Sequence, residues 1–172
     1  MIDGDGSLLA CGQFADSSRF NSVADVHEHN GSIVAAVVSG SETWRGRVRV
    51  VSVSNDLTLL SSQTLDIANV QFADIEPLAN GFFLAGQAPP GNGTVGSPVG
   101  FLARFDSAGD RQWRADFGDA SFGNVIATES GGAVFVLGSA CAGGITRTVC
   151  LVEIDSAGDV ATEIDLTPGI EY

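Results

Sequence analysis

Lysine is absent from this sequence of 172 residues, and all eight basic residues are arginines. Schiff-base chemistry on a lysine amine and phosphate binding by a P-loop lysine are therefore excluded. The arginines stand against 21 acidic residues, which gives a net charge of −13 at neutral pH. Because binding to nucleic acids depends on clustered basic residues that release counterions, we expect no nucleic-acid partner.

Long apolar runs are also missing, since no run approaches the roughly 18 residues of a membrane helix, and we expect no membrane span. The first residues, Met-Ile-Asp-Gly-Asp-Gly, lack the basic and apolar segments of a secretory signal peptide. We therefore expect either a cytoplasmic protein or a piece of a longer protein that carries its signal elsewhere.

Cysteine is scarce, and the odd count of three leaves at least one thiol without a partner in the chain. Cys141 and Cys150 flank a short loop rich in glycine and threonine. If the flanking segments pair as a hairpin, the two side chains come within disulfide distance. The alternative is a pair of buried thiols that act as small apolar side chains.

An internal repeat organises the sequence. The pentapeptide Asp-Ser-Ala-Gly-Asp occurs at 106–110 and at 155–159, and an apolar segment precedes each copy. Degenerate copies stand at 50–60 and at 2–14. The period is about 50 residues, which is typical of a supersecondary unit that stacks on its neighbours.

Glycine turns recur between these landmarks. Asn30-Gly31, Asn80-Gly81 and Gly131-Gly132 each precede an apolar strand, and a shorter apolar segment precedes each turn. Such dipeptides predict type I′ hairpin turns, in which both central residues have positive φ. One period therefore holds four strands, and no window shows helical apolar spacing. We predict an all-β fold in a single repeat domain, with a leading outer strand at 2–14 and four-stranded antiparallel units at 15–66, 67–118 and 119–172.

Two stretches of the chain share one pattern of turns and strands most clearly. They are segment 80–86 with segment 100–113, and segment 131–138 with segment 149–161. They read as a glycine turn, an apolar strand, a loop, a second strand and an Asp/Gly turn. This order of turns and strands resembles the repeats of bacterial β-propeller proteins of the seven-bladed type, with about 50 residues per blade. The resemblance implies a noncatalytic binding or structural scaffold in a bacterial secreted or surface protein. Its motifs mark turns and packing, and the loop at 87–99 is the expected contact surface for a protein or glycan ligand.

The number of units conflicts with a closed ring, because propellers usually have about four to eight blades. Three interpretations follow. The chain is a fragment of a larger propeller, it completes its ring with another copy, or its three units close as a β-trefoil. The trefoil would be a carbohydrate-binding lectin, but Thr162 stands where the preceding unit has Trp113. That difference argues against three equivalent sugar sites.

Asp25, His27 and His29 alternate along the sequence, so an extended strand places all three side chains on one face. A carboxylate and two imidazoles can bind zinc or a similar divalent cation, the one cofactor that the sequence suggests. Such a site would open the further alternative of a metal-dependent enzyme. The competing interpretation is a polar hairpin turn at 28–31.

Two further features are candidates for ligand binding. Arg45, Arg47 and Arg49 also alternate, and they form a basic stripe that can receive a carboxylate or phosphate group. The alternative is a solvated strand face. Trp113 can stack on a sugar ring, or it can pack between neighbouring units.

Overall fold

The computed structural model describes residues 20–42, 45–91, 98–118, 121–138 and 149–166. Within these ranges the chain forms twelve β-strands, and none of the described residues belongs to a helix that could cross a membrane. The strands are β1 (Phe20–His29), β2 (Ser32–Glu42), β3 (Arg45–Ser54), β4 (Leu59–Thr64), β5 (Phe72–Leu78), β6 (Gly81–Ala88), β7 (Val99–Asp106), β8 (Arg111–Asp116), β9 (Ser121–Ala127), β10 (Ala133–Gly138), β11 (Val149–Ile154) and β12 (Val160–Asp165).

The strands form three four-stranded sheets, β1–β4, β5–β8 and β9–β12, and neighbours along the chain pair antiparallel. The predicted all-β architecture of three four-stranded antiparallel units is thus confirmed. The expected leading strand at 2–14 lies outside the described residues. Among the described residues, one isolated bridge lies outside these sheets, between Gly46 of β3 and Val70 in the connection from β4 to β5. Each unit is therefore a separate sheet.

The turn between the third and fourth strands has the same hydrogen bonds in each sheet. In the second sheet the Gly109 N–H donates to the Asp106 carbonyl at 3.0 Å, and the Asp106 N–H donates to the Asp110 carbonyl at 3.1 Å. The left-handed position is occupied by glycine in two turns and by Leu57, with φ of 64°, in the first. The turns are residues 54–58, 106–110 and 155–159.

The turn between the first and second strands differs among the sheets. Asn30 and Gly31 have φ of 51° and 74°, as the predicted type I′ turn requires. In the second sheet Leu78 pairs with Gly81, so the turn is centred one residue earlier than predicted. The type I′ prediction is wrong there and at 131–132, where only the first glycine has positive φ.

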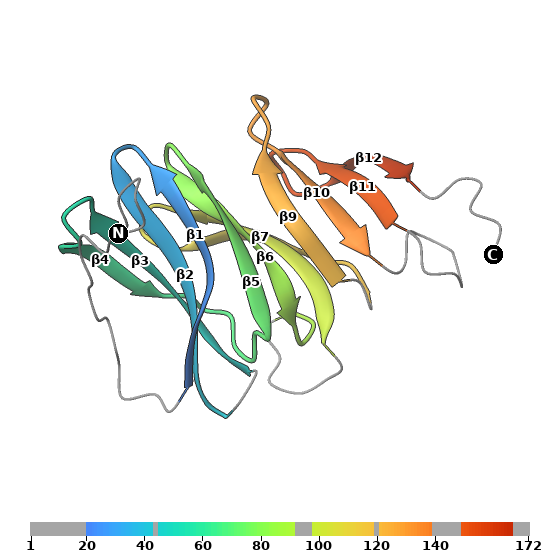
Figure 1. Ribbon diagram of the computed structural model, residues 1–172. Coiled ribbons are helices and arrows are strands. Elements are labelled where there is room, and N and C mark those ends of the chain that lie inside the picture. The colour runs from blue at the N-terminus through green and yellow to red at the C-terminus, as the bar shows by residue number, and fades with distance from the viewer. Residues whose placement is uncertain (1–19, 43–44, 92–97, 119–120, 139–148, 167–172) are drawn as a thin grey trace, which may run out of the picture.

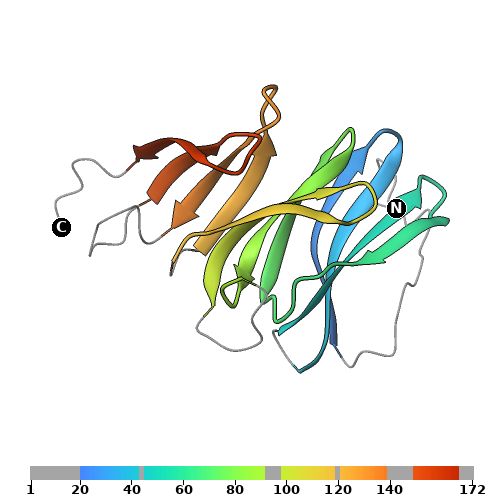
Figure 2. The same cartoon turned by 180° about the vertical axis from the view of Figure 1, so that it is seen from behind.

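The core consists of two apolar layers, one on each side of the middle sheet. The sheets stack face to face in a row, and their first strands β1, β5 and β9 lie side by side (Figures 1 and 2). Val48 and Val50 of the first sheet and Phe101 of the second belong to one layer. Phe83 of the second sheet and Phe135 of the third belong to the other. Burial on both faces explains the apolar runs of the middle sheet.

Candidate functional site

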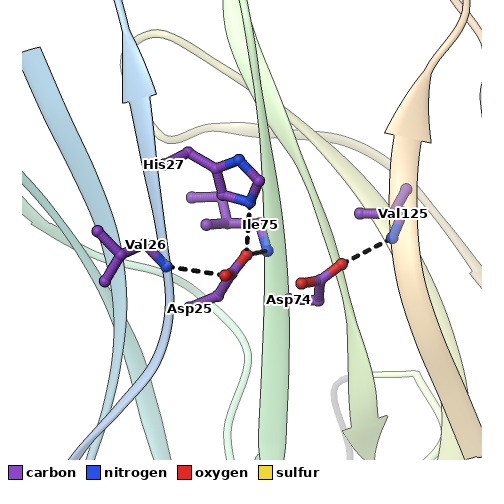
Figure 3. A network of polar contacts seen from close by, with 6 residues as sticks. All are labelled: Asp25, Val26, His27, Asp74, Ile75 and Val125. Atoms are coloured by element: carbon purple, nitrogen blue, oxygen red, sulfur yellow. Dashed lines mark hydrogen bonds and ion pairs between the residues drawn. The ribbon is translucent and has the colours of Figure 1, made fainter.

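A cluster of polar side chains lies where β1 and β5 run side by side. Asp25 and His27 are half-buried, whereas Val26 and Glu28 between them are exposed. This alternation follows from the strand geometry, because successive side chains point to opposite faces. The half-buried face is turned toward β5, which contributes Asp74 (Figure 3).

Asp25 has hydrogen-bonding partners on both β1 and β5. Its Oδ2 accepts the backbone N–H of Ile75 on β5 at 3.0 Å and lies 2.8 Å from Nε2 of His27. Its Oδ1 accepts the N–H of Val26 at 2.8 Å. The carboxylate therefore links the first sheet to the backbone of the second (Figure 3).

Asp74 repeats the same link one sheet further along the row. Its Oδ2 accepts the backbone N–H of Val125 on β9 at 2.7 Å (Figure 3). The two donors, Ile75 and Val125, occupy corresponding places in the first strands of their sheets. A carboxylate on the first strand thus binds the next first strand at both junctions between sheets.

The two carboxyl groups have opposite pKa shifts. Burial and the neighbouring Asp25 carboxylate together raise the pKa of Asp74 to about 6, against the Val125 hydrogen bond and the charge of His27. Burial also acts to raise the pKa of Asp25, but the hydrogen bonds from Ile75, Asp74 and Val26 and the charge of His27 outweigh it. The pKa of Asp25 is therefore lowered, and the pair favours one shared proton.

The cluster has the composition of a metal site. Asp25, His27 and Asp74 each offer one ligand atom, and these atoms lie within 4.8 Å of one another. The predicted set contained His29 instead of Asp74. In the structure Nε2 of His29 lies 2.9 Å from the amide nitrogen of Asn30 in the adjoining turn. The internal repeat could have identified Asp74, because Ala-Asp-Ile at 73–75 corresponds to Ala-Asp-Val at 24–26 and so pairs Asp74 with Asp25.

The predicted arginine stripe lies on β3. Arg47 is exposed and Arg49 is half-buried, and they alternate with Val48 and Val50, which face the second sheet. The two arginines therefore lie on the face directed away from the second sheet. The side chain of Arg45 lies outside the described part of the chain. Binding of an anionic ligand by this stripe stays a prediction.

Trp113 lies between the second and third sheets. Its Nε1–H donates to the Ser156 carbonyl at 3.1 Å, and its ring centre lies 5.8 Å from that of Phe83. A Cβ atom placed on Gly158 would lie only 2.9 Å from the indole ring. These contacts agree with the packing alternative for Trp113. A polar groove of about 430 Å³ borders the same side chain, and stacking of a sugar ring stays a prediction.

Cys150 is fully buried on β11 and forms a disulfide. Cys141 lies outside the described residues, so the predicted Cys141–Cys150 pairing stays a prediction. Comparisons with known proteins assign no family: no protein-family model matches the chain, and a search of curated proteins finds no significant relative.

Proposed function

We propose that the chain is a noncatalytic β-propeller-type repeat module that serves as a binding or structural scaffold of a bacterial secreted or surface protein. The observation that carries this proposal is the repeated link between first strands. Asp25 binds the N–H of Ile75, and Asp74 binds the N–H of Val125. A link that recurs in the same place at both junctions is expected of units stacked around a common axis.

The arrangement of the sheets favours propeller blades over a β-trefoil. Each unit is a complete four-stranded meander, and the described strands pair within their own sheet apart from one isolated bridge. A trefoil barrel is built from strands of different repeats that pair with one another. The face-to-face stacking, with β1, β5 and β9 side by side, is the arrangement of blades in a propeller.

The outer face of the third sheet supports continuation of the row. Asn124 stands at the place of Asp25 and Asp74, and it follows the same alternation. On the same face Ile126 of β9 is 62% exposed and Ile164 of β12 is 48% exposed. Exposed apolar side chains on a sheet face indicate a contact surface. We propose that this face receives the four-stranded unit of a second copy of the chain.

Sedimentation velocity tests this proposal. We expect the wild-type chain to form a defined oligomer, and Ile126→Asp or Ile164→Asp to dissociate it. Val160→Asp is the matched control, because Val160 lies on the same strand as Ile164, is 53% exposed, and pairs with the inward-facing Ile154. A compact wild-type monomer, or equal effects of all the variants, would overturn the proposed contact.

The loop after β6 is the proposed contact surface for a protein ligand. Arg114 of β8 holds the described start of this loop, since its guanidinium donates to the Pro89 carbonyl at 2.8 Å and also to the Gly91 carbonyl. The Gly91 N–H donates in turn to Asp116 at 2.9 Å. A fixed base beneath a loop that contains consecutive prolines and glycines suits a recognition segment on a rigid scaffold.

A carbohydrate-binding role is the second candidate, and the groove beside Trp113 favours it. The groove combines one indole with amide, carboxylate and guanidinium groups, which are the side chains that sugar hydroxyls contact. A glycan array separates the two functions. Reproducible binding that Gln112→Ala abolishes would support the lectin, and absence of binding to all glycans would support the scaffold. The groove is lined by Asn80, Arg104, Asp106, Gln112, Trp113 and Ser156.

A further inference from the structure

We propose that Asp25, His27 and Asp74 bind a divalent transition-metal ion of the zinc type at the junction between the first and second sheets. This site goes beyond a scaffold role, because it adds a metal-dependent connection between units. The three side chains come from two strands, and their ligand atoms lie within 4.8 Å of one another. Asp74 joins Asp25 and His27 only in the folded chain, because it lies on β5 and they lie on β1.

The donor set selects the class of metal ion. One imidazole nitrogen and two carboxylate oxygens are ligands that Zn²⁺ accepts in tetrahedral sites. Calcium and magnesium prefer sites made of oxygen atoms alone, and calcium needs about six to eight of them. Three protein ligands leave one tetrahedral position for water. The cluster therefore fits a zinc-type ion better than Ca²⁺ or Mg²⁺.

The distances require little movement to form the site. Around a tetrahedral zinc ion with bonds of about 2.0–2.1 Å, ligand atoms lie roughly 3.3 Å apart. Nε2 of His27 and Oδ2 of Asp25 are already 2.8 Å apart, and the full set spans at most 4.8 Å. In this contact Nε2 of His27 carries a proton that it donates to Asp25. Metal binding would displace that proton to solvent, and a small rotation of the imidazole would then turn the freed Nε2 lone pair toward the shared ion.

Backbone hydrogen bonds hold both carboxylates in place. The Ile75 N–H donates to Asp25, and the Val125 N–H donates to Asp74. Each ionised carboxylate has about four acceptor positions, so these bonds leave lone pairs for a metal ion. Partners of this kind orient metal ligands and reduce the entropy that binding costs.

The charge around the cluster also favours a cation. Two half-buried carboxylates lie side by side in a chain of net charge −13. A divalent ion between them replaces repulsion by attraction and draws β1 toward β5. The ion would thereby add to the direct link between Asp25 and Ile75.

Titration of the whole chain with ZnCl₂, after dialysis against EDTA, tests the proposal by calorimetry and by NMR of the imidazole signals. We expect saturable binding to one site and a shift of the His27 signals, with the His29 signals unchanged. His27→Ala and Asp74→Asn should each weaken binding on the order of tenfold or more. CaCl₂ and MgCl₂ at the same concentration should give no saturable heat.

His29→Ala is the matched control, because His29 lies on the same strand and outside the cluster. It should bind Zn²⁺ as the wild type does. The wild-type NMR titration needs no variant, so a poorly folding substitution does not affect it. Unchanged His27 signals at saturating zinc, or equal losses in His27→Ala and His29→Ala, would overturn the proposal.

Discussion

Oδ2 of Asp25 on β1 accepts a hydrogen bond from the backbone N–H of Ile75 on β5 at 3.0 Å. The bond joins two sheets that meet mainly through apolar side chains. Apolar contacts have no preferred direction, whereas a hydrogen bond to a carboxylate fixes the distance and register of its partners. The same bond between Asp74 and Val125 indicates that each sheet is positioned on the next in the same way.

Removal of the Asp25 carboxylate should weaken the junction between the first and second sheets. We expect Asp25→Ala to lower the free energy of unfolding by about 1–3 kcal/mol, because the Ile75 N–H then loses a charged acceptor. Urea unfolding followed by circular dichroism measures the change. Glu28→Ala is the control, since Glu28 is exposed on the opposite face of the same strand. Equal stabilities of the two variants would show that the link contributes nothing.

The metal-free protein should lose stability as the pH rises from about 4 to 6. In the folded state the pKa of Asp74 is raised to about 6, so folding takes up a proton in this interval. The pKa of Asp25 is lowered, and its contribution is present at neutral pH and lost as the pH falls below the usual range of aspartate. These opposite signs predict maximal stability at mildly acidic pH.

Asp74→Asn checks the assignment, because an amide does not titrate. Urea unfolding in EDTA at several pH values should show a flatter profile between about pH 4 and 6 for this variant than for the wild type. The loss of stability at low pH that comes from protonation of Asp25 should remain in this variant. A profile for Asp74→Asn that parallels the wild type over this interval would assign the pH dependence to other groups.

A methyl group at Gly158 should disturb the packing of the third sheet on the second. Gly158 and Gly131 both have positive φ, at 95° and 81°, so alanine is strained at either position. A Cβ on Gly158 would also lie 2.9 Å from the Trp113 ring, whereas on Gly131 its nearest neighbour is 3.9 Å away. Thermal unfolding should therefore show a larger loss for Gly158→Ala than for Gly131→Ala. A loss no larger than that of Gly131→Ala would mean that Trp113 moves aside without cost.

The sequence predicts most of the fold because the relevant signals are local. The repeated Asp-Ser-Ala-Gly-Asp turns and the alternation around Asp25 depend on neighbouring residues alone. The predicted turn at 80–81 lies one residue after the observed one, because Asn-Gly permits positive φ at both positions without requiring it. There the pairing of Leu78 with Gly81 fixes the turn centre instead.

The candidate site is harder to predict, because it forms between sheets. Asp25 and Asp74 are about 50 residues apart, in equivalent places of successive repeats. Strand periodicity places Asp25, His27 and His29 on one face, but it cannot tell which of them the next sheet approaches. The position of β5 selects the first two and adds Asp74. Likewise, the role of Trp113 depends on the turn at 155–159 of the following sheet.

Arg114 should be one of the most sensitive positions of the second sheet. Its side chain is 6% exposed, pairs with Asp116 at 2.6 Å, and lies 4.7 Å from the centre of the Phe101 ring. Arg114→Ala would leave the carboxylate and the Pro89 carbonyl without this donor, at a cost of about 2–4 kcal/mol. The stability of Arg114→Lys should lie between those of the wild type and Arg114→Ala, because an ammonium group keeps the charge but not the planar fork of donors.

Urea unfolding measures the stability, and hydrogen exchange at the Gly91 amide measures the loop directly, since that N–H donates to Asp116. Exchange at Gly91 should accelerate in Arg114→Ala by more than the global loss of stability explains, because the base of the loop is released locally. Arg47→Ala, at an exposed arginine of β3, is the control and should change neither quantity. Unchanged exchange at Gly91 in Arg114→Ala would show that the loop is held by other contacts.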